Sequence, residues 1–211
     1  MYIPTLFRSD DRETAFDLIE EIRLGSLVSA DPEIQVSHLP FMIDRMPGAM
    51  GRLIGHCARA NPQWKSFGGE GEVLVVFLGP QTYVSPDWYG TRPRAPTWLY
   101  ASVHVWGRSR LVDERDATRD MVVRLSEEME PPSSAWSTES IAPYTEKLLP
   151  GIVGFHIDIT SIQTQLRLGQ QNTLDDRRRV HGALSNGDMS QRLVGRLMER
   201  FSFLDLPPTT P

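Results

Sequence analysis

The sequence predicts an α+β protein that is mainly β, with an antiparallel sheet or barrel and helices at its periphery. Stretches with strand character mostly come first, and the chain lacks the strand–helix alternation of a doubly wound fold. Residues 96–111 alternate clearly, with an aliphatic face formed by Leu99, Ala101, Val103 and Val105 that we assign to the core. Residues 72–78 are nearly all apolar and β-branched, which is typical of a buried strand.

Length and composition limit the class of protein. A chain of 211 residues fits one large domain, and we expect that domain over residues 1–206 with a disordered tail over residues 207–211. The formal net charge of −5 argues against strong non-specific binding to nucleic acid. Cys57 is the single cysteine, and no targeting segment or membrane-spanning apolar run is visible. We therefore expect a cytoplasmic protein without a membrane partner.

The first part of the chain is expected to supply a helix and three strands. An apolar stripe at helical spacing over residues 10–24, headed by Asp10 or Asp11, predicts the helix. Runs bounded by turn residues predict strands over residues 26–30, 34–43 and 50–57, with a turn over residues 44–49. Pro40 has no N–H to donate to a β ladder, so it marks a sheet edge or a bulge.

The run from Gly55 to Trp64 is predicted to end a strand, turn and begin a helix. Asn61 is a good N-cap, and Pro62 suits the first helical position, whose N–H has no partner. Helix starts attract anions and Arg59 adds a positive charge, so one interpretation is an anion-binding corner beside the Trp64 indole. The alternative is a capped helix with Trp64 in the core and Arg59 on the surface, and these ten residues alone favour it.

The strand that begins near residue 72 is expected to stop at Gly79-Pro80, followed by a short strand and turn over residues 82–89. The second face of the alternating stretch is formed by Trp98, Tyr100, Ser102, His104 and Trp106. Such an aromatic face meets a subunit, a helix or a ligand, or is covered by helices of the protein itself. The sequence leaves these two interpretations about equal.

The remaining pattern predicts helices over residues 113–130, 142–149, 175–184 and 189–201, and a strand over residues 153–160 that continues over 163–168 after a kink. In the first of these helices Met121, Val122, Leu125 and Met129 are expected to point inward. The run from Asp175 to Arg179 suits a solvated helix face, and no helix-turn-helix signature is visible. We therefore predict no sequence-specific binding to duplex DNA.

Several short motifs occur together in order along the chain. They are Met1-Tyr2-Ile3-Pro4, Ser37-His38-Leu39-Pro40, the run from Gly55 to Trp64, Phe77-Leu78-Gly79-Pro80, Tyr83-Val84-Ser85-Pro86-Asp87-Trp88-Tyr89, Pro96-Thr97-Trp98 with Tyr100, and Gly151-Ile152-Val153-Gly154-Phe155. Through them the chain resembles the PaiB family of FMN-binding negative transcriptional regulators over roughly residues 1–184. The resemblance implies a split β-barrel of the FMN-binding type and a homodimer with the cofactor at its interface.

The resemblance also implies the cofactor residues. The family's positions fall on Ser37, His38, His56, Arg59, Asn61, Thr97, Trp98 and Tyr100, with Arg167 and Gln170 as matches near the C-terminus. Such residues can hold a phosphate or carboxylate and flank a flat ring.

Two departures from the family pattern stand out. Leu99 stands where the family usually has asparagine, which makes that position less polar. Residues 165–171 replace the family's Lys-Phe-Lys-Leu-Ser-Gln-Asn by Gln-Leu-Arg-Leu-Gly-Gln-Gln. A flavin phosphate would therefore lose at least one cation and one hydroxyl.

A related branch that the chain resembles, the haem-dependent piperazate synthases, closes an N–N bond in N-hydroxylated ornithine. Haem b would need a histidine ligand and arginines for its propionates. His56, His38 or His104 could supply the ligand, with His56 as our choice, and Arg59 could bind a propionate. We place FMN ahead of haem, with an empty or metabolite-binding site as a third interpretation. Any regulatory role would then be indirect, through cofactor or metabolite binding.

Overall fold

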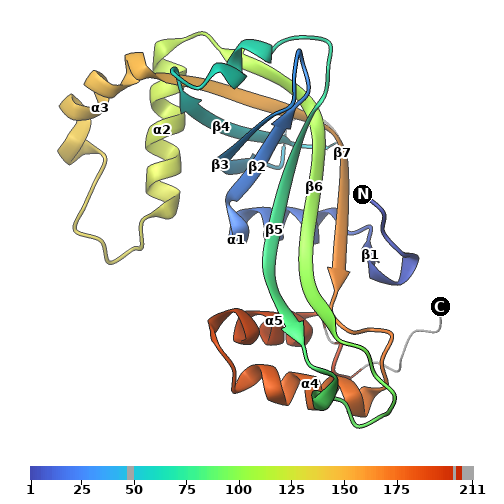
Figure 1. The fold of residues 1–211 in the computed structure, drawn as a ribbon. Coiled ribbons are helices and arrows are strands. Elements are labelled where there is room, and N and C mark those ends of the chain that lie inside the picture. Colours follow the sequence, from blue (N-terminus) through green and yellow to red (C-terminus); the bar gives the residue numbers. More distant parts are fainter. Residues whose placement is uncertain (47–49, 202, 206–211) are drawn as a thin grey trace. The chain divides into compact units, whose positions relative to one another are not determined.

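The computed structural model of the chain describes residues 1–46, 50–201 and 203–205 (Figure 1). The last residues of the predicted 44–49 turn and the predicted tail over residues 207–211 lie outside the described residues. The chain divides into two compact units: unit 1 contains Met1–Ala15, Leu78–Val103 and the part from Gln163 onward, and unit 2 contains Phe16–Phe77 and His104–Ile162. The expected single domain over residues 1–206 stays a prediction, and each unit is described by itself.

The described residues form an antiparallel sheet of seven strands. The strands are β1 (Arg8–Ser9), β2 (Leu24–Ser29), β3 (Gln35–Asp44), β4 (Arg52–Ala58), β5 (Val73–Val84), β6 (Thr97–Val112) and β7 (Ile152–Arg167). Their order is β1-β7-β4-β3-β2-β5-β6, and β7 also pairs with β6, so the pairings from β2 to β7 close into a ring. The pairs β1–β7, β2–β3, β2–β5, β3–β4 and β4–β7 are antiparallel. This confirms the predicted fold class.

The helices flank the strands. They are α1 (Arg12–Ile22), α2 (Arg115–Met129), α3 (Ala142–Leu148), α4 (Leu174–Ser185) and α5 (Met189–Arg200), with 3-10 turns η1 (Thr5–Phe7), η2 (Pro62–Ser66), η3 (Pro86–Trp88), η4 (Glu139–Ile141) and η5 (Leu149–Gly151). Asp11 caps α1 by accepting hydrogen bonds from the N–H groups of Glu13 and Thr14. Within the described ranges, no helix is both long enough and apolar enough to cross a membrane.

Phenylalanine rings form the centre of the core of unit 2. Phe41 packs edge to face against Phe77 and Phe155, with ring centroids 5.7 and 6.1 Å apart. Gly25 makes this packing feasible, because a Cβ there would lie 2.6 Å from Val75 Cγ1. Two strand positions without side chains, Gly25 and Gly55, thus leave the space that the rings fill.

In unit 1 the predicted aliphatic face is confirmed, since Leu99, Ala101 and Val103 are each at most 1% exposed. Ser102, expected on the opposite face, is also buried, so this part of β6 is covered on both sides. The helices α4 and α5 lie side by side near the end of β5 (Figure 1).

Several local predictions are wrong. Gly79-Pro80 do not end the strand, because β5 runs on to Val84. The β2–β5 ladder ends at Val76, so the missing N–H of Pro80 falls beyond that ladder. Met129, expected to point inward, is 54% exposed because it is the last residue of α2.

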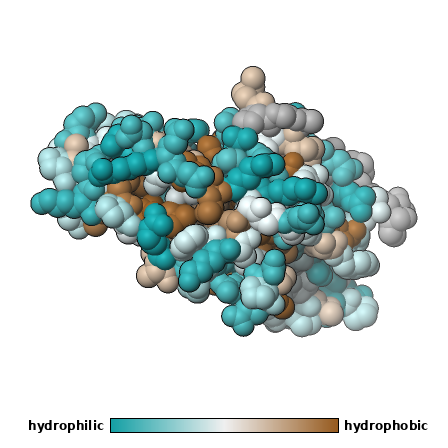
Figure 2. Space-filling model, turned by 90° about the horizontal axis from the view of Figure 1, so that it is seen from above, coloured by the Kyte–Doolittle hydropathy of each residue, from teal (hydrophilic) through white to brown (hydrophobic). Residues whose placement is uncertain are grey.

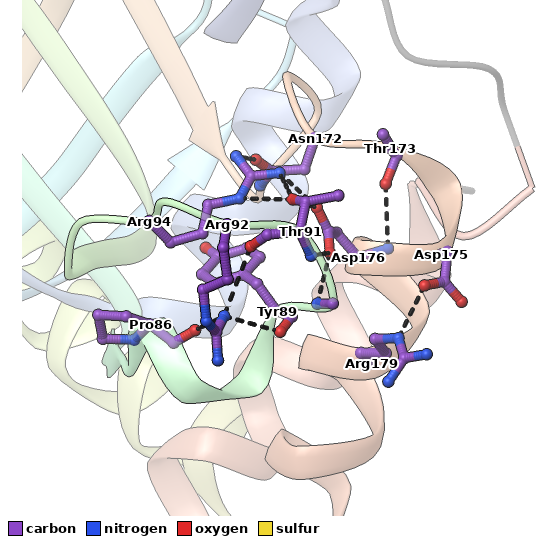
Figure 3. Close-up of polar contacts among 11 residues, drawn as sticks. Pro86, Tyr89, Thr91, Arg92, Arg94, Asn172, Thr173, Asp175, Asp176 and Arg179 are labelled. Carbon is purple, nitrogen blue, oxygen red and sulfur yellow. Dashed lines mark hydrogen bonds and ion pairs between the residues drawn. The ribbon is translucent and has the colours of Figure 1, made fainter.

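The predicted solvated face over residues 175–179 is wrong at Asp176 and Arg177, which are 0% and 2% exposed. Asp176 accepts hydrogen bonds from the Gly90 N–H at 2.7 Å and the Thr91 N–H at 3.1 Å, and from the Thr91 hydroxyl at 2.6 Å. Arg94 also donates to it (Figure 3). Burial alone would raise the pKa of this carboxyl, but the donors outweigh burial and lower its pKa to about 2. One buried carboxylate thus ties the loop after β5 to the start of α4.

Candidate functional site

The ten predicted site residues fall into two groups of five. Unit 2 contains Ser37, His38, His56, Arg59 and Asn61, and unit 1 contains Thr97, Trp98, Tyr100, Arg167 and Gln170. Each group has its own geometry.

In unit 2, Asn61 links β3 to η2. Its Nδ2 donates to Ser37 Oγ at 2.7 Å, and its Oδ1 accepts from the Gln63 N–H at 3.0 Å. The second bond confirms Asn61 as the N-cap, although the helix it caps is a single 3-10 turn. Because Ser37 accepts from Asn61, its own hydroxyl proton is available to a ligand.

Gln63 holds the same turn in place and was not singled out by the sequence. Its side chain is 1% exposed, and Nε2 donates to the carbonyls of Leu27 at 3.1 Å and Gln35 at 3.2 Å. These bonds attach η2 to β2 and β3. Gln63 lies two residues after the N-cap residue Asn61 and belongs to no periodic apolar pattern. The sequence therefore contains no signal that predicts the burial of its side chain.

The two histidines of this group differ in burial. His38 is exposed, and its Nδ1 lies 3.0 Å from Ser26 Oγ. His56 is half-buried opposite Gly154 in the β4–β7 register, and burial lowers its pKa. In the part of the chain that the structure describes, its ring makes no hydrogen bond. A neutral imidazole of this kind is suited to bind a metal.

Arg59 is exposed but fixed in place. Its Nε donates to the Pro150 carbonyl at 2.9 Å and its Nη2 to the Ile152 carbonyl at 3.1 Å. The guanidinium lies 5.8 Å from the centre of the Trp64 ring, whose Nε1 donates to the Arg59 carbonyl. Trp64 is half-buried, so the expectation of a core tryptophan is wrong. The surface position expected for Arg59 is correct.

In unit 1, Arg167 is the central charge. Its Nη2 donates to Thr97 Oγ1 at 2.9 Å, and its guanidinium lies 5.7 Å from the Phe7 ring centre. Its Nε is buried without a hydrogen-bond partner, and no carboxylate among the described residues pairs with it. A half-buried, unpaired arginine beside a hydroxyl group is suited to hold an anion.

Aromatic side chains on two strands of unit 1 lie at the surface. Trp98 is 52% exposed and Tyr83 is 45% exposed, and their rings pack edge to face with centroids 6.2 Å apart. Tyr100, two residues along β6, is half-buried. Exposed aromatic pairs of this kind are suited to contact a flat ring or a second subunit.

Gln170 has its amide engaged by the backbone. Its Oε1 accepts from the Leu168 N–H at 2.8 Å, its Nε2 donates to the Leu166 carbonyl, and the side chain is 5% exposed. These bonds shape the turn at Gly169, whose φ of +93° favours glycine. Glycine instead of the family's serine therefore suits the backbone at this position.

These observations test whether the predicted cofactors suit the residues present. For FMN, the buried and unpartnered Nε of Arg167 and the Thr97 hydroxyl match the donors that a phosphate requires. For haem, His56 would offer a neutral imidazole nitrogen as a ligand to the iron, because burial lowers its pKa. The described residues contain no group of three or more His, Cys, Asp or Glu side chains that could hold a metal ion by itself.

Comparison with known proteins gives a family and several relatives. The family model described as "Putative FMN-binding domain" matches residues 1–161. The chain is 29% identical over 202 residues to the protease synthase and sporulation protein PAI 2 of Bacillus subtilis, covering 94% of this chain and 97% of that protein. It is also 29% identical over 154 residues to the uncharacterized protein YKL070W of Saccharomyces cerevisiae, covering 62% of this chain and 90% of that protein.

Solved structures share the fold at low sequence identity. The flavocytochrome Anf3 of Azotobacter vinelandii matches with a TM-score of 0.56 and 13% identity, covering 76% of this chain and 69% of that one. An FAD- and haem-binding protein of Mycobacterium smegmatis matches with a TM-score of 0.56 and 17% identity, covering 76% and 73%. At these identities the likeness concerns the split-barrel fold alone. Because the family model spans well over half of the chain, this protein belongs to the FMN-binding domain family, the PaiB-type family that its motifs predicted.

Proposed function

We propose that this protein binds FMN, with the flavin phosphate held by Arg167 and Thr97. The observation that carries the proposal is the Arg167 guanidinium, which is half-buried, hydrogen-bonded to Thr97 and unpaired with any carboxylate of the described residues. A cation in such a position is costly unless an anion is present for it. Membership of the FMN-binding domain family supports the FMN phosphate as that anion.

The residues of this chain have binding and orienting roles. Arg167 supplies charge-assisted donors, and Thr97 keeps a hydroxyl proton to donate after accepting from Arg167. Bound FMN would supply one- and two-electron redox chemistry. The exposed Trp98 and Tyr83 rings offer an apolar surface that excludes water from one side of a bound molecule.

The proposal includes a homodimer in the cytoplasm, as the family resemblance and the composition predict. The exposed Trp98–Tyr83 pair supports it, because large exposed aromatic side chains are typical of subunit interfaces. Light scattering at micromolar concentration should give the mass of two chains. The mass of a single chain would contradict the proposed homodimer. It would not bear on the flavin contacts of Arg167 and Thr97, which have their own test.

A regulatory role would be indirect. The acidic chain and the exposed acidic residues of α2 argue against a groove-reading helix. A mobility-shift assay at physiological salt should show no sequence-specific duplex binding. A tight and salt-resistant complex with one promoter would contradict this part of the proposal.

The flavin test compares FMN with riboflavin, which lacks the phosphate. Charge-assisted hydrogen bonds contribute about 1.5–3 kcal/mol, so Arg167→Gln should weaken FMN binding about 10- to 100-fold and riboflavin binding very little. Arg108→Gln is the matched control, because Arg108 is an exposed strand arginine outside this group. Equal FMN affinity in Arg167→Gln and Arg108→Gln would refute the phosphate site.

Haem b is the second candidate, supported by the half-buried, neutral His56 imidazole that makes no hydrogen bond to the described residues. In that case the protein would resemble a haem-dependent synthase that forms N–N bonds. A Soret band after haem addition that His56→Ala abolishes, with unchanged thermal stability, would favour haem. No Soret band in the wild-type protein would eliminate this candidate.

A further inference from the structure

Unit 2 contains a cavity of about 510 Å³, within the range of small-molecule sites. It is bordered by η2, the end of β6, the start of α2, η5 and the start of β7. Its apolar walls come from Leu111, Val112, Leu149, Pro150, Ile152 and Val153. Apolar surface ringed by hydrophilic side chains is visible on the side of the view where α2 and α3 lie (Figure 2).

Arg59 and Trp64 form one side of this cavity. The two carbonyl bonds of Arg59 fix its guanidinium beside the indole, and no carboxylate of the described ranges pairs with it. Its Nη1 group therefore keeps its donors for a ligand. An arginine that is immobilised before binding loses little side-chain entropy when an anion arrives.

The start of α2 forms the opposite polar element. The side chain of its N-cap residue, Glu114, makes no capping hydrogen bond, so it leaves the backbone N–H groups of the first turn uncapped. Thr118 lines the cavity with a side chain that is 7% exposed, and its hydroxyl makes no hydrogen bond to the described residues. This hydroxyl lies in the cavity wall and is a second polar group that a ligand in the cavity could contact.

The balance of charge around the cavity favours a single negative charge. Arg115 lines the cavity, but its Nη2 is 2.7 Å from the Glu146 carboxylate, which pairs with it and also with Arg119. Asp113 adds a negative charge to the rim. Arg59 remains as a cation without an ion-pair partner among the described residues, and the positive end of α2 adds to its field. Asp113 and Glu146 would oppose a dianionic phosphate more strongly than a single carboxylate.

We propose that this cavity binds a small, planar, apolar molecule that carries one carboxylate. The carboxylate pairs with Arg59 and accepts from the Thr118 hydroxyl, and the planar body lies against Trp64 and the aliphatic wall. This site goes beyond the proposed flavin site, because neither Arg167 nor Thr97 lines the cavity. It assigns Arg59, which the family resemblance gives to the cofactor, to a second ligand.

The test uses 2-naphthoate as the probe and naphthalene-2-carboxamide as its uncharged analogue. Calorimetry on the full chain, with and without saturating FMN, should show the carboxylate binding at least about tenfold more tightly than the amide. Arg59→Gln should remove this preference. Thr118→Val keeps the side-chain volume, and should weaken naphthoate binding severalfold and amide binding less, because a carboxylate oxygen accepts a stronger hydrogen bond than an amide oxygen.

Arg92→Gln is the matched control, because Arg92 also donates to backbone carbonyls, those of Pro86, Tyr89 and Thr91, but lies outside the cavity. It should leave naphthoate binding unchanged. Equal affinity for the acid and the amide, no detectable binding of naphthoate, or unchanged binding in Arg59→Gln would each overturn the proposal. Competitive displacement of naphthoate by FMN, with FMN binding lost in Arg59→Gln but kept in Arg167→Gln, would assign the cavity to flavin and overturn it as well.

Discussion

Replacing Asp176 by asparagine should lower the stability of unit 1 substantially. The carboxylate is fully buried and accepts from the N–H groups of Gly90 and Thr91, the Thr91 hydroxyl and Arg94 (Figure 3). Asparagine keeps one acceptor oxygen but turns an NH2 group toward donors, so hydrogen bonds are lost and a donor is left unsatisfied.

The size of the effect follows from the pKa of Asp176, which folding lowers from 3.8 to about 2. Each pKa unit corresponds to about 1.4 kcal/mol, so ionisation of this one group contributes roughly 2.5 kcal/mol at neutral pH. For a chain of this length that corresponds to a melting temperature lower by about 5–10 °C, if the chain unfolds in one transition.

The dependence on pH has a defined sign. Because the folded pKa lies below the unfolded one, the stabilisation is complete above about pH 4 and disappears as the pH falls toward 2. Calorimetry at pH 7, 4 and 3 should therefore show the difference between wild type and Asp176→Asn shrinking below pH 4. Asp175→Asn is the control, since that carboxylate is 70% exposed and, among the described residues, forms an ion pair with Arg179 alone, so its loss should cost about 0.5 kcal/mol or less. Equal losses in the two variants, or a difference independent of pH, would refute the reasoning.

Three further predictions concern unit 2. Burial raises the pKa of the Cys57 thiol to about 11, so a disulfide reagent at pH 8 should react only after denaturant unfolds the protein, and a fast stoichiometric reaction with the native protein would contradict this. Gln63→Ala should lower the free energy of unfolding by about 1–3 kcal/mol in urea titrations, because buried carbonyls lose their donor, and an unchanged midpoint would show that η2 is held otherwise. Gly107→Ala should lower the free energy of unfolding by about 1–3 kcal/mol, since a Cβ there would lie 2.5 Å from the Asp158 carbonyl oxygen. The control is Gly182→Ala in α4, where the new Cβ meets open space, so this variant should be as stable as the wild type or more stable.

The parts of the fold that were predictable depend on local periodicity. The strict alternation around Leu99 identified a buried strand face because a pleated strand exposes successive side chains to opposite sides. The N-cap at Asn61 was predictable because the bond it makes spans only two residues. Contacts between segments that are far apart in sequence produce no local pattern. The burial of Gln63 was therefore not predicted, and Asp176 was wrongly predicted to be solvated, because their hydrogen-bond partners lie on other elements.

For the candidate site, the sequence predicted which residues take part but not the contacts they make. Motif resemblance identified Arg167 and Thr97, and the structure shows them hydrogen-bonded to each other. It could not show that the Gln170 amide is occupied by backbone groups, because that depends on how the turn around Gly169 closes. Nor could it reveal the cavity beside Arg59, whose walls come from five separate elements.

Leu99 illustrates how a departure from a family pattern is interpreted differently once the fold is known. By comparison with the family's asparagine, the leucine makes this position less polar. The structure shows what that position contacts, because Leu99 is 1% exposed and its Cδ2 lies about 4.0 Å from where a Cβ on Gly169 would be. Both departures, leucine at 99 and glycine at 169, therefore meet at one packed turn. These two departures therefore affect the packing of the turn that follows Arg167. The polarity around a bound flavin would depend on the side chains that remain exposed.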